Sequence, residues 1–161
     1  MRALLAALSV LSLASAAGAS VAHAASNRLT SPEAVCARIG TDDALRPLSP
    51  SLVGPATQAF GYTGVTAAEV EHMTVFRCMD GAVLMCSWGA NLACGKAETS
   101  PTLPSAANWC EGNQNAASIP AYVTGHDTIY RWSCHDGNAV ASNPAPLDAR
   151  GFFQSYWVPA Q

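Results

Sequence analysis

The chain has 161 residues, half of them hydrophobic, and its 8 basic and 11 acidic residues give a formal net charge of −3. A chain of this length buries one modest core, so we expect a single domain. The small acidic excess and the lack of a basic run argue against nucleic acid as a partner.

Residues 1–24 have the form of a secretory signal peptide. Arg2 precedes an apolar stretch, and Ala22-His23-Ala24 has the small-x-small pattern that signal peptidase accepts. The alternative is an uncleaved membrane anchor, but the most apolar part, residues 4–13, is about half as long as a membrane span of ~20 residues. We therefore expect cleavage, no stable membrane insertion afterwards, and a periplasmic or extracellular location.

All six cysteines follow this segment, and an even number of cysteines in an exported chain predicts three disulfides. Six cysteines allow fifteen pairings, of which the sequence favours only a local bridge from Cys86 to Cys94. No Cys-x-x-Cys redox pair, haem attachment motif or paired zinc ligands occur. We therefore expect structural disulfides, no metal and no cofactor. The cysteines are Cys36, Cys78, Cys86, Cys94, Cys110 and Cys134.

The first predicted element is a short helix that begins after Ser31, as its N-cap, and ends near Ile39 because Gly40 stops it. Residues 41–64 are rich in proline and glycine and predict a loop with one helical turn at residues 56–60. Residues 25–64 are thus expected to form a loop-rich N-terminal covering segment of a domain that spans residues 25–161.

The remaining chain contains an internal similarity. Residues 74–81 read Thr-Val-Phe-Arg-Cys-Met-Asp-Gly, and residues 128–137 read Thr-Ile-Tyr-Arg-Trp-Ser-Cys-His-Asp-Gly. In both copies β-branched and aromatic residues lead into Asp-Gly, which favours the two positive φ angles of a tight hairpin turn. We expect two hairpins in one antiparallel sheet.

Two further elements complete the expected fold. Residues 105–113 predict a helix that covers one face of the sheet. Four C-terminal aromatic residues either complete the sheet edge or close the core, and core closure is favoured; they are Phe152, Phe153, Tyr156 and Trp157. The fold class is therefore mainly β or small α+β, with antiparallel hairpins and one or two short helices in a disulfide-stapled single domain.

Two histidines, His126 and His135, are each followed by aspartate. This pairing suggests a catalytic base with an orienting carboxylate, or a metal site. Adjacent residues of an extended strand point to opposite faces, however, so neither dipeptide places both groups in one pocket. Common hydrolase and phosphate-binding motifs do not occur. We assign no catalytic and no metal-binding residue, and keep as an alternative a small hydrolase or metal-dependent enzyme using His126, Asp127 or His135.

The favoured recognition surface combines two segments. Residues 88–96 form a glycine-flanked loop, rigid if Cys86 and Cys94 pair, and residues 119–127 lead into the second hairpin. The alternative is that residues 88–96 are only a tight connection, with Trp88 packed inward. The four tryptophans also suggest carbohydrate stacking, although tryptophans of a small domain are more often core. The predicted binding residues are Trp88, Asn91, Lys96, Tyr122, His126 and Asp127.

Several stretches, residues 76–81, 89–96, 119–130 and 148–152, together resemble a family of small exported bacterial six-cysteine proteins without an assigned function. This resemblance covers nearly all the chain after the signal and implies a periplasmic protein, but brings no mechanism. Phe76-Arg77-Cys78-Met79-Asp80-Gly81 also resembles the first strand and turn of periplasmic lysozyme inhibitors. The inhibitors' Ser-Gly loop and later signature do not occur here, so this likeness implies β architecture more than inhibition.

Together these features predict a non-catalytic binding or interaction module of the cell envelope, with an envelope protein or a glycan as partner. A structural envelope component without a small ligand is the third hypothesis.

Overall fold

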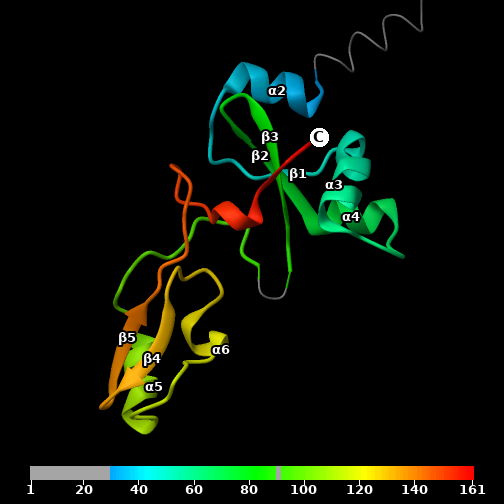
Figure 1. The fold of residues 1–161 in the computed structure, drawn as a ribbon. Helices are drawn as coiled ribbons and strands as arrows, with labels where there is room; N and C mark the ends of the chain where they lie inside the picture. Colours follow the sequence, from blue (N-terminus) through cyan, green and yellow to red (C-terminus); the bar gives the residue numbers. More distant parts are fainter. Residues whose placement is uncertain (1–29, 90–91) are drawn as a thin grey trace, which may run out of the picture.

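The computed structural model describes residues 30–89 and 92–161. Figure 1 shows two β-hairpins, one in the upper half of the view and one in the lower, with short helices beside each. The fold is mainly antiparallel β with short helices, as expected. The predicted signal peptide, residues 1–24, lies outside the described residues.

The N-terminal covering segment contains more regular structure than predicted. After α2 (Pro32–Ile39), residues 41–64 were expected to be a loop with one helical turn, but they form a strand, a 3₁₀ turn and a two-turn helix. Pro55 is accommodated because it lies in the first helical turn, where its missing N–H has no intrahelical partner. These elements are β1 (Arg46–Pro47), η1 (Pro50–Leu52) and α3 (Val53–Phe60).

A further helix, α4 (Ala67–Met73), was not predicted, although the sequence carries its signal. The Thr66 hydroxyl accepts a hydrogen bond from the Glu69 N–H at 3.3 Å, and the Glu69 carboxylate accepts one from the Thr66 N–H at 2.6 Å. This reciprocal capping box satisfies two N–H groups at the helix start.

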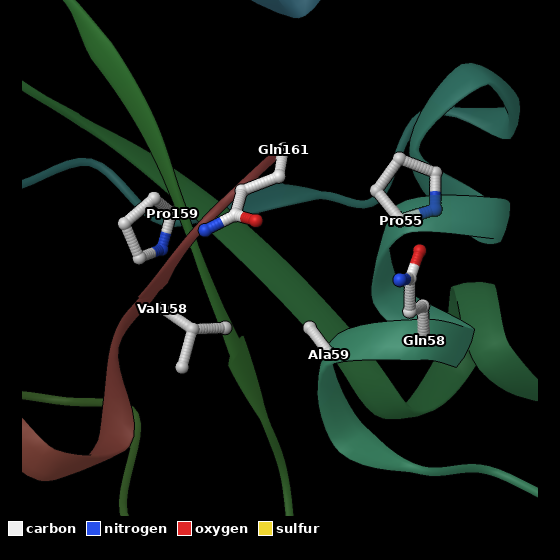
Figure 2. A pocket seen from close by; sticks show the side chains of 6 residues that line it. All are labelled: Pro55, Gln58, Ala59, Val158, Pro159 and Gln161. Atoms are coloured by element: carbon white, nitrogen blue, oxygen red, sulfur yellow. The ribbon is translucent and has the colours of Figure 1, made fainter.

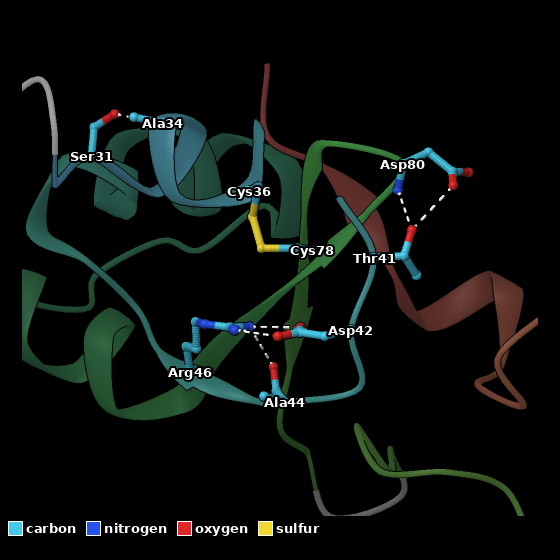
Figure 3. Close-up of a disulfide and its surroundings, with 9 residues drawn as sticks. All are labelled: Ser31, Ala34, Cys36, Thr41, Asp42, Ala44, Arg46, Cys78 and Asp80. Carbon is cyan, nitrogen blue, oxygen red and sulfur yellow. Dashed lines mark hydrogen bonds and ion pairs between the residues drawn. A yellow bond between two sulfur atoms is a disulfide. The ribbon is translucent and has the colours of Figure 1, made fainter. Parts of the chain in front are cut away.

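The first hairpin, β2 (Thr74–Met79) and β3 (Ala82–Ser87), is the centre of a four-stranded antiparallel sheet in the order β1-β2-β3-β6. Its turn has positive φ at Asp80 (52°) and Gly81 (79°), as the Asp-Gly pair predicted. Thr41 secures that turn, accepting from the Asp80 N–H at 2.8 Å and donating to the Asp80 carboxylate at 3.1 Å (Figure 3).

The second hairpin, β4 (Arg131–His135) and β5 (Asn138–Ser142), forms a separate two-stranded sheet, so the prediction of one sheet was wrong. The reason lies in the strand edges. β1 and β6 occupy both edges of the first hairpin, and residues 116–119 bond to the outer edge of β4 through Ile119 N–H to the Trp132 carbonyl at 2.8 Å. These segments take the pairing positions that the second hairpin would have needed at the middle of the first hairpin and along β4.

Two helices accompany the second hairpin, α5 (Pro104–Gly112) and the single turn α6 (Ala121–Thr124). The α5 helix was predicted at residues 105–113, and it packs on β4 and β5 as a cover for that sheet. Its Ala106 and Cys110 are fully buried, in a cluster with Ile119, Trp132 and Cys134.

All six cysteines are paired, which confirms the three predicted disulfides. Cys86–Cys94 is the expected local bridge. Cys36–Cys78 joins α2 to β2, as Figure 3 shows, and Cys110–Cys134 joins α5 to β4. Each bridge lies in the interior, since no cysteine is more than 7% exposed. Such bridges are typical of proteins from oxidising compartments.

The C-terminal segment, with η2 (Gln154–Tyr156) and β6 (Val158–Pro159), performs both roles that were posed as alternatives. Phe152, Phe153 and Trp157 are buried, and Tyr156 is half-buried. The same segment pairs with β3 and so completes the sheet edge. No helix within residues 30–89 and 92–161 has the length and apolar character needed to cross a membrane.

Candidate functional site

The structure joins the two segments predicted to form a recognition surface. The Glu98 N–H donates to the Asp127 carbonyl at 2.7 Å, and the Ile129 N–H donates to the Glu98 carbonyl at 3.0 Å. Glu98 and Thr128 thereby form a short parallel bridge. The end of the loop that contains Lys96 therefore lies beside the entry to the second hairpin, although about thirty residues separate them.

The loop at residues 88–96 is anchored at its start and its end. The Trp88 N–H donates to the Met73 carbonyl at 2.7 Å, and the Cys86–Cys94 disulfide closes the loop. Trp88 is 45% exposed, so the alternative of an inward-packed tryptophan is wrong. Asn91, the predicted amide of this loop, lies outside the described residues.

Lys96 belongs to a surface ion cluster. Its Nζ lies 2.6 Å from the Asp43 carboxylate, which also accepts two hydrogen bonds from the Arg150 guanidinium, at 2.8 and 2.9 Å. The hydrogen bonds from Arg150, and then that from Lys96, hold the pKa of Asp43 well below its ordinary value. Lys96 thus takes part in an intramolecular ion pair, and Asp43 already compensates part of its charge.

On the other segment Tyr122 and Asp127 have different surroundings. Tyr122 projects from α6 and is 83% exposed. Asp127 folds back on Gly125, whose φ is +82°; a Cβ added to Gly125 would lie 2.7 Å from the Asp127 Oδ1. The backbone at Gly125 therefore strongly favours glycine over any residue with a side chain.

His126 lines an open hollow of about 360 Å³ beside the second hairpin. The Tyr130 and Trp132 rings meet edge to face with centroids 6.0 Å apart, and the Trp132 Nε1–H donates to the Thr128 hydroxyl at 3.0 Å. The lining residues are Ala117, Ser118, Ile119, Ala121, Thr124, Gly125, His126, Thr128, Tyr130, Arg131 and Trp132.

Of the two His-Asp dipeptides, only His135-Asp136 forms an ion pair in the described residues, with 3.1 Å between Nδ1 and Oδ2. The two side chains meet here because Asp136 has a positive φ in the hairpin turn, so the divergence of neighbours in an extended strand does not apply to this pair. Both side chains are more than three-quarters exposed and line no hollow among those described. Within residues 30–89 and 92–161, no three His, Cys, Asp or Glu side chains gather in a way that could hold a metal ion.

The tryptophans do not form a common stacking surface. Trp132 and Trp157 are buried, and Trp109 is half-buried against the core of the second hairpin, which leaves Trp88 exposed. A second hollow of about 360 Å³ lies between α3 and the C-terminal strand (Figure 2). Its lining contains no charged side chain: Pro55, Gln58, Ala59, Val158, Pro159 and Gln161.

Sequence reasoning missed Arg131 and Thr128 as parts of the hollow. Burial along β4 alternates, with Trp132 and Cys134 inside and Arg131 and His135 exposed, so the period-two pattern could have placed Arg131 outward. The hollow itself depends on α6 and residues 117–119, whose position no local pattern reveals.

Comparisons with protein-family models, curated proteins and solved structures found no match to the chain. The resemblances drawn from the sequence therefore stay predictions.

Proposed function

We propose that the protein is an exported, non-catalytic binding module of the cell envelope, and that its ligand is a glycan or a glycan fragment. The observation that carries this proposal is the Glu98–Thr128 bridge, which holds the segment that follows Lys96 against the segment that follows His126, next to the hollow. We call the surface made by Lys96, Tyr122, His126 and Asp127 with this hollow the joined surface.

The disulfides support a binding role because they reduce the flexibility of both parts of the joined surface. Cys86–Cys94 restrains the loop that leads to Lys96, and Cys110–Cys134 ties α5 to the strand that carries Arg131. A surface held in place before binding loses less conformational entropy when a ligand is bound. Export is supported by the same bridges, which persist in oxidising compartments, and by the signal-like N-terminal sequence.

The test is a thermal unfolding screen of the disulfide-bonded protein against neutral sugars, acidic sugars and peptidoglycan fragments. A ligand at about 100 times its Kd stabilises the native state by about 2.7 kcal/mol, which raises the Tm by several degrees in a protein of this size. We expect Tyr122→Ala and His126→Ala to reduce that rise.

The matched control is Gln58→Ala, in the hollow of Figure 2, which should leave the rise unchanged. Mass spectrometry of the ligand afterwards decides between binding and catalysis. Recovery of intact ligand is expected, whereas cleavage products that disappear in His126→Ala would contradict a non-catalytic role. Stabilisation only by a purified envelope protein would replace the glycan with a protein partner.

A further inference from the structure

Most cationic side chains of the described chain are neutralised by a carboxylate, and Arg131 at the hollow is not. Within residues 30–89 and 92–161, the ion pairs of the arginines and the lysine are Arg46–Asp42, Arg77–Asp148, Lys96–Asp43 and Arg150–Asp43. Arg131 has no carboxylate within ion-pair distance among these residues, and it lines the hollow. Its exposed guanidinium is therefore available to a ligand.

Thr128 offers a second donor at the same place. Its hydroxyl oxygen accepts hydrogen bonds from the Trp132 Nε1–H at 3.0 Å and from the Tyr130 N–H at 3.3 Å. A hydroxyl has two acceptor lone pairs and one proton, so both lone pairs are used and the O–H remains to donate. The Trp132 ring thus orients the Thr128 hydroxyl as a donor.

His126 adds an imidazole, and no carboxylate belongs to the lining of this hollow. The nearest acidic neighbour in the chain, Asp127, folds back on Gly125 and is not a lining residue. A lining that combines donors with a free positive charge favours an anionic group, and a guanidinium fork matches the two oxygens of a carboxylate.

The rest of the lining indicates what carries the carboxylate. Hydroxyls of Ser118 and Tyr130 can exchange hydrogen bonds with alcohol groups, and Ile119 and Trp132 supply an apolar wall. At about 360 Å³ the hollow is at the small end of ligand pockets, with room for about one or two sugar rings.

We propose that this hollow binds a small polyhydroxylated carboxylic acid, the chemistry of a uronic acid, with its carboxylate on Arg131 and Thr128. This inference rests on the proposed function and names the class of its ligand. The negative charge of Asp127 beside the hollow weakens the binding of such an acid. Removing the Asp127 charge should therefore strengthen binding, whereas removing the Arg131 charge should weaken it.

The experiment is a calorimetric titration of the disulfide-bonded protein with glucuronate, with glucose as the neutral counterpart and inorganic phosphate as the alternative anion, all at one ionic strength. We expect glucuronate to bind at least about tenfold more tightly than glucose, since hydrogen bonds to a charged group are strong, and more tightly than phosphate, since only the sugar also reaches the hydroxyls and the apolar wall of the lining. Arg131→Gln should lose about tenfold in glucuronate affinity, and Asp127→Asn should gain severalfold.

Arg38→Gln is the charge-matched control, because Arg38 is also exposed and has no ion pair among the described residues. It should leave the affinity unchanged. Intact mass and unfolding curves verify that each variant retains its disulfides and its fold. Ser118→Ala is a further test at the lining, because it removes no charge and no hydrogen bond within the described part of the chain, and it should weaken binding of the acid by about two- to fivefold.

Each other outcome overturns the inference, and the outcomes separate it from the proposed function. Equal affinity for glucose and glucuronate, insensitive to Arg131→Gln, leaves a binding module whose ligand is neutral. Phosphate binding more tightly than glucuronate, with the same loss in Arg131→Gln, leaves a binding module for phosphorylated ligands. Binding of none of the three probes overturns the acid-sugar ligand while leaving the wider glycan screen as the test of the function.

Discussion

The guanidinium of Arg77 and the carboxylate of Asp148 form an ion pair in the protein interior, although 71 residues separate them in the chain. Arg77 is fully buried and contacts the rings of both Phe152 and Trp157, with its Cζ 4.3 and 4.6 Å from their centroids. The pair connects the first hairpin to the C-terminal segment. The aromatic tail is thus held by this ion pair and by the cation–π contacts of Arg77 as well as by β6.

Asp148→Ala should destabilise the protein by about 3 to 5 kcal/mol, because it leaves the Arg77 charge buried without its partner. Urea denaturation monitored by tryptophan fluorescence measures this loss. The control is Asp42→Ala, which removes the partly exposed pair with Arg46 and should cost about 1 kcal/mol or less. Equal losses of unfolding free energy in the two variants would contradict a larger contribution from the buried Arg77–Asp148 pair.

The three disulfides should differ in their contribution to stability. Removing both cysteines of one bridge should cost about 4 kcal/mol for Cys36–Cys78, about 3.5 for Cys110–Cys134 and about 2.5 for Cys86–Cys94, since the bridges close 42, 24 and 8 residues. The three Cys→Ala pairs serve as controls for one another, because all six cysteines are buried. The reverse order in denaturation midpoints would refute the chain-entropy explanation.

Acid should weaken the surface ion cluster around Asp43. Its folded-state pKa lies below its ordinary value of 3.8, so the unfolded chain binds the proton first, and the stabilisation present above that value is lost as the pH falls. NMR titration of the Asp43 carboxylate checks the direction. Arg150→Met should raise this pKa more than Lys96→Met, because the hydrogen bonds from Arg150 are the larger cause. An Asp43 that titrates at its ordinary value in the unmodified protein would contradict the cluster.

Gly125→Ala should destabilise the protein by about 1 to 2 kcal/mol and weaken ligand binding at the joined surface. The added Cβ would meet the Asp127 carboxylate, and the φ of +82° disfavours any side chain. Gly54→Ala is the matched control. Its site in α3 has open space around the new methyl group, so we expect unchanged binding and up to about 1 kcal/mol of added stability. For both variants, thermal unfolding measures the change in stability and the glucuronate titration measures the change in affinity.

The sequence predicts the features of this fold that depend on neighbouring residues. Asp80-Gly81 identifies the first hairpin turn, and Ser31 with Gly40 bounds α2. The capping box of Thr66 and Glu69 could also have been predicted, since a threonine followed three residues later by a glutamate is typical of a helix start.

Features that depend on distant contacts could not be predicted. Arg77 lies in a strand where an arginine ordinarily faces solvent, and its burial requires Asp148 and two rings from the far end of the chain. The division into two sheets depends on which segments take the strand edges. Similarly, Tyr122, His126 and Asp127 were candidates from the sequence, whereas Arg131 became one only when α6 and residues 117–119 were seen to form a hollow beside it.

The most direct test of the account is an NMR titration of isotope-labelled, disulfide-bonded protein with glucuronate, followed by mass spectrometry of the recovered sugar. We predict saturable amide shifts confined to residues 96–98 and 117–132, with the sugar recovered intact. Shifts centred on residues 55–59 and 158–161, or consumption of the sugar, would contradict a non-catalytic binding module that uses the joined surface.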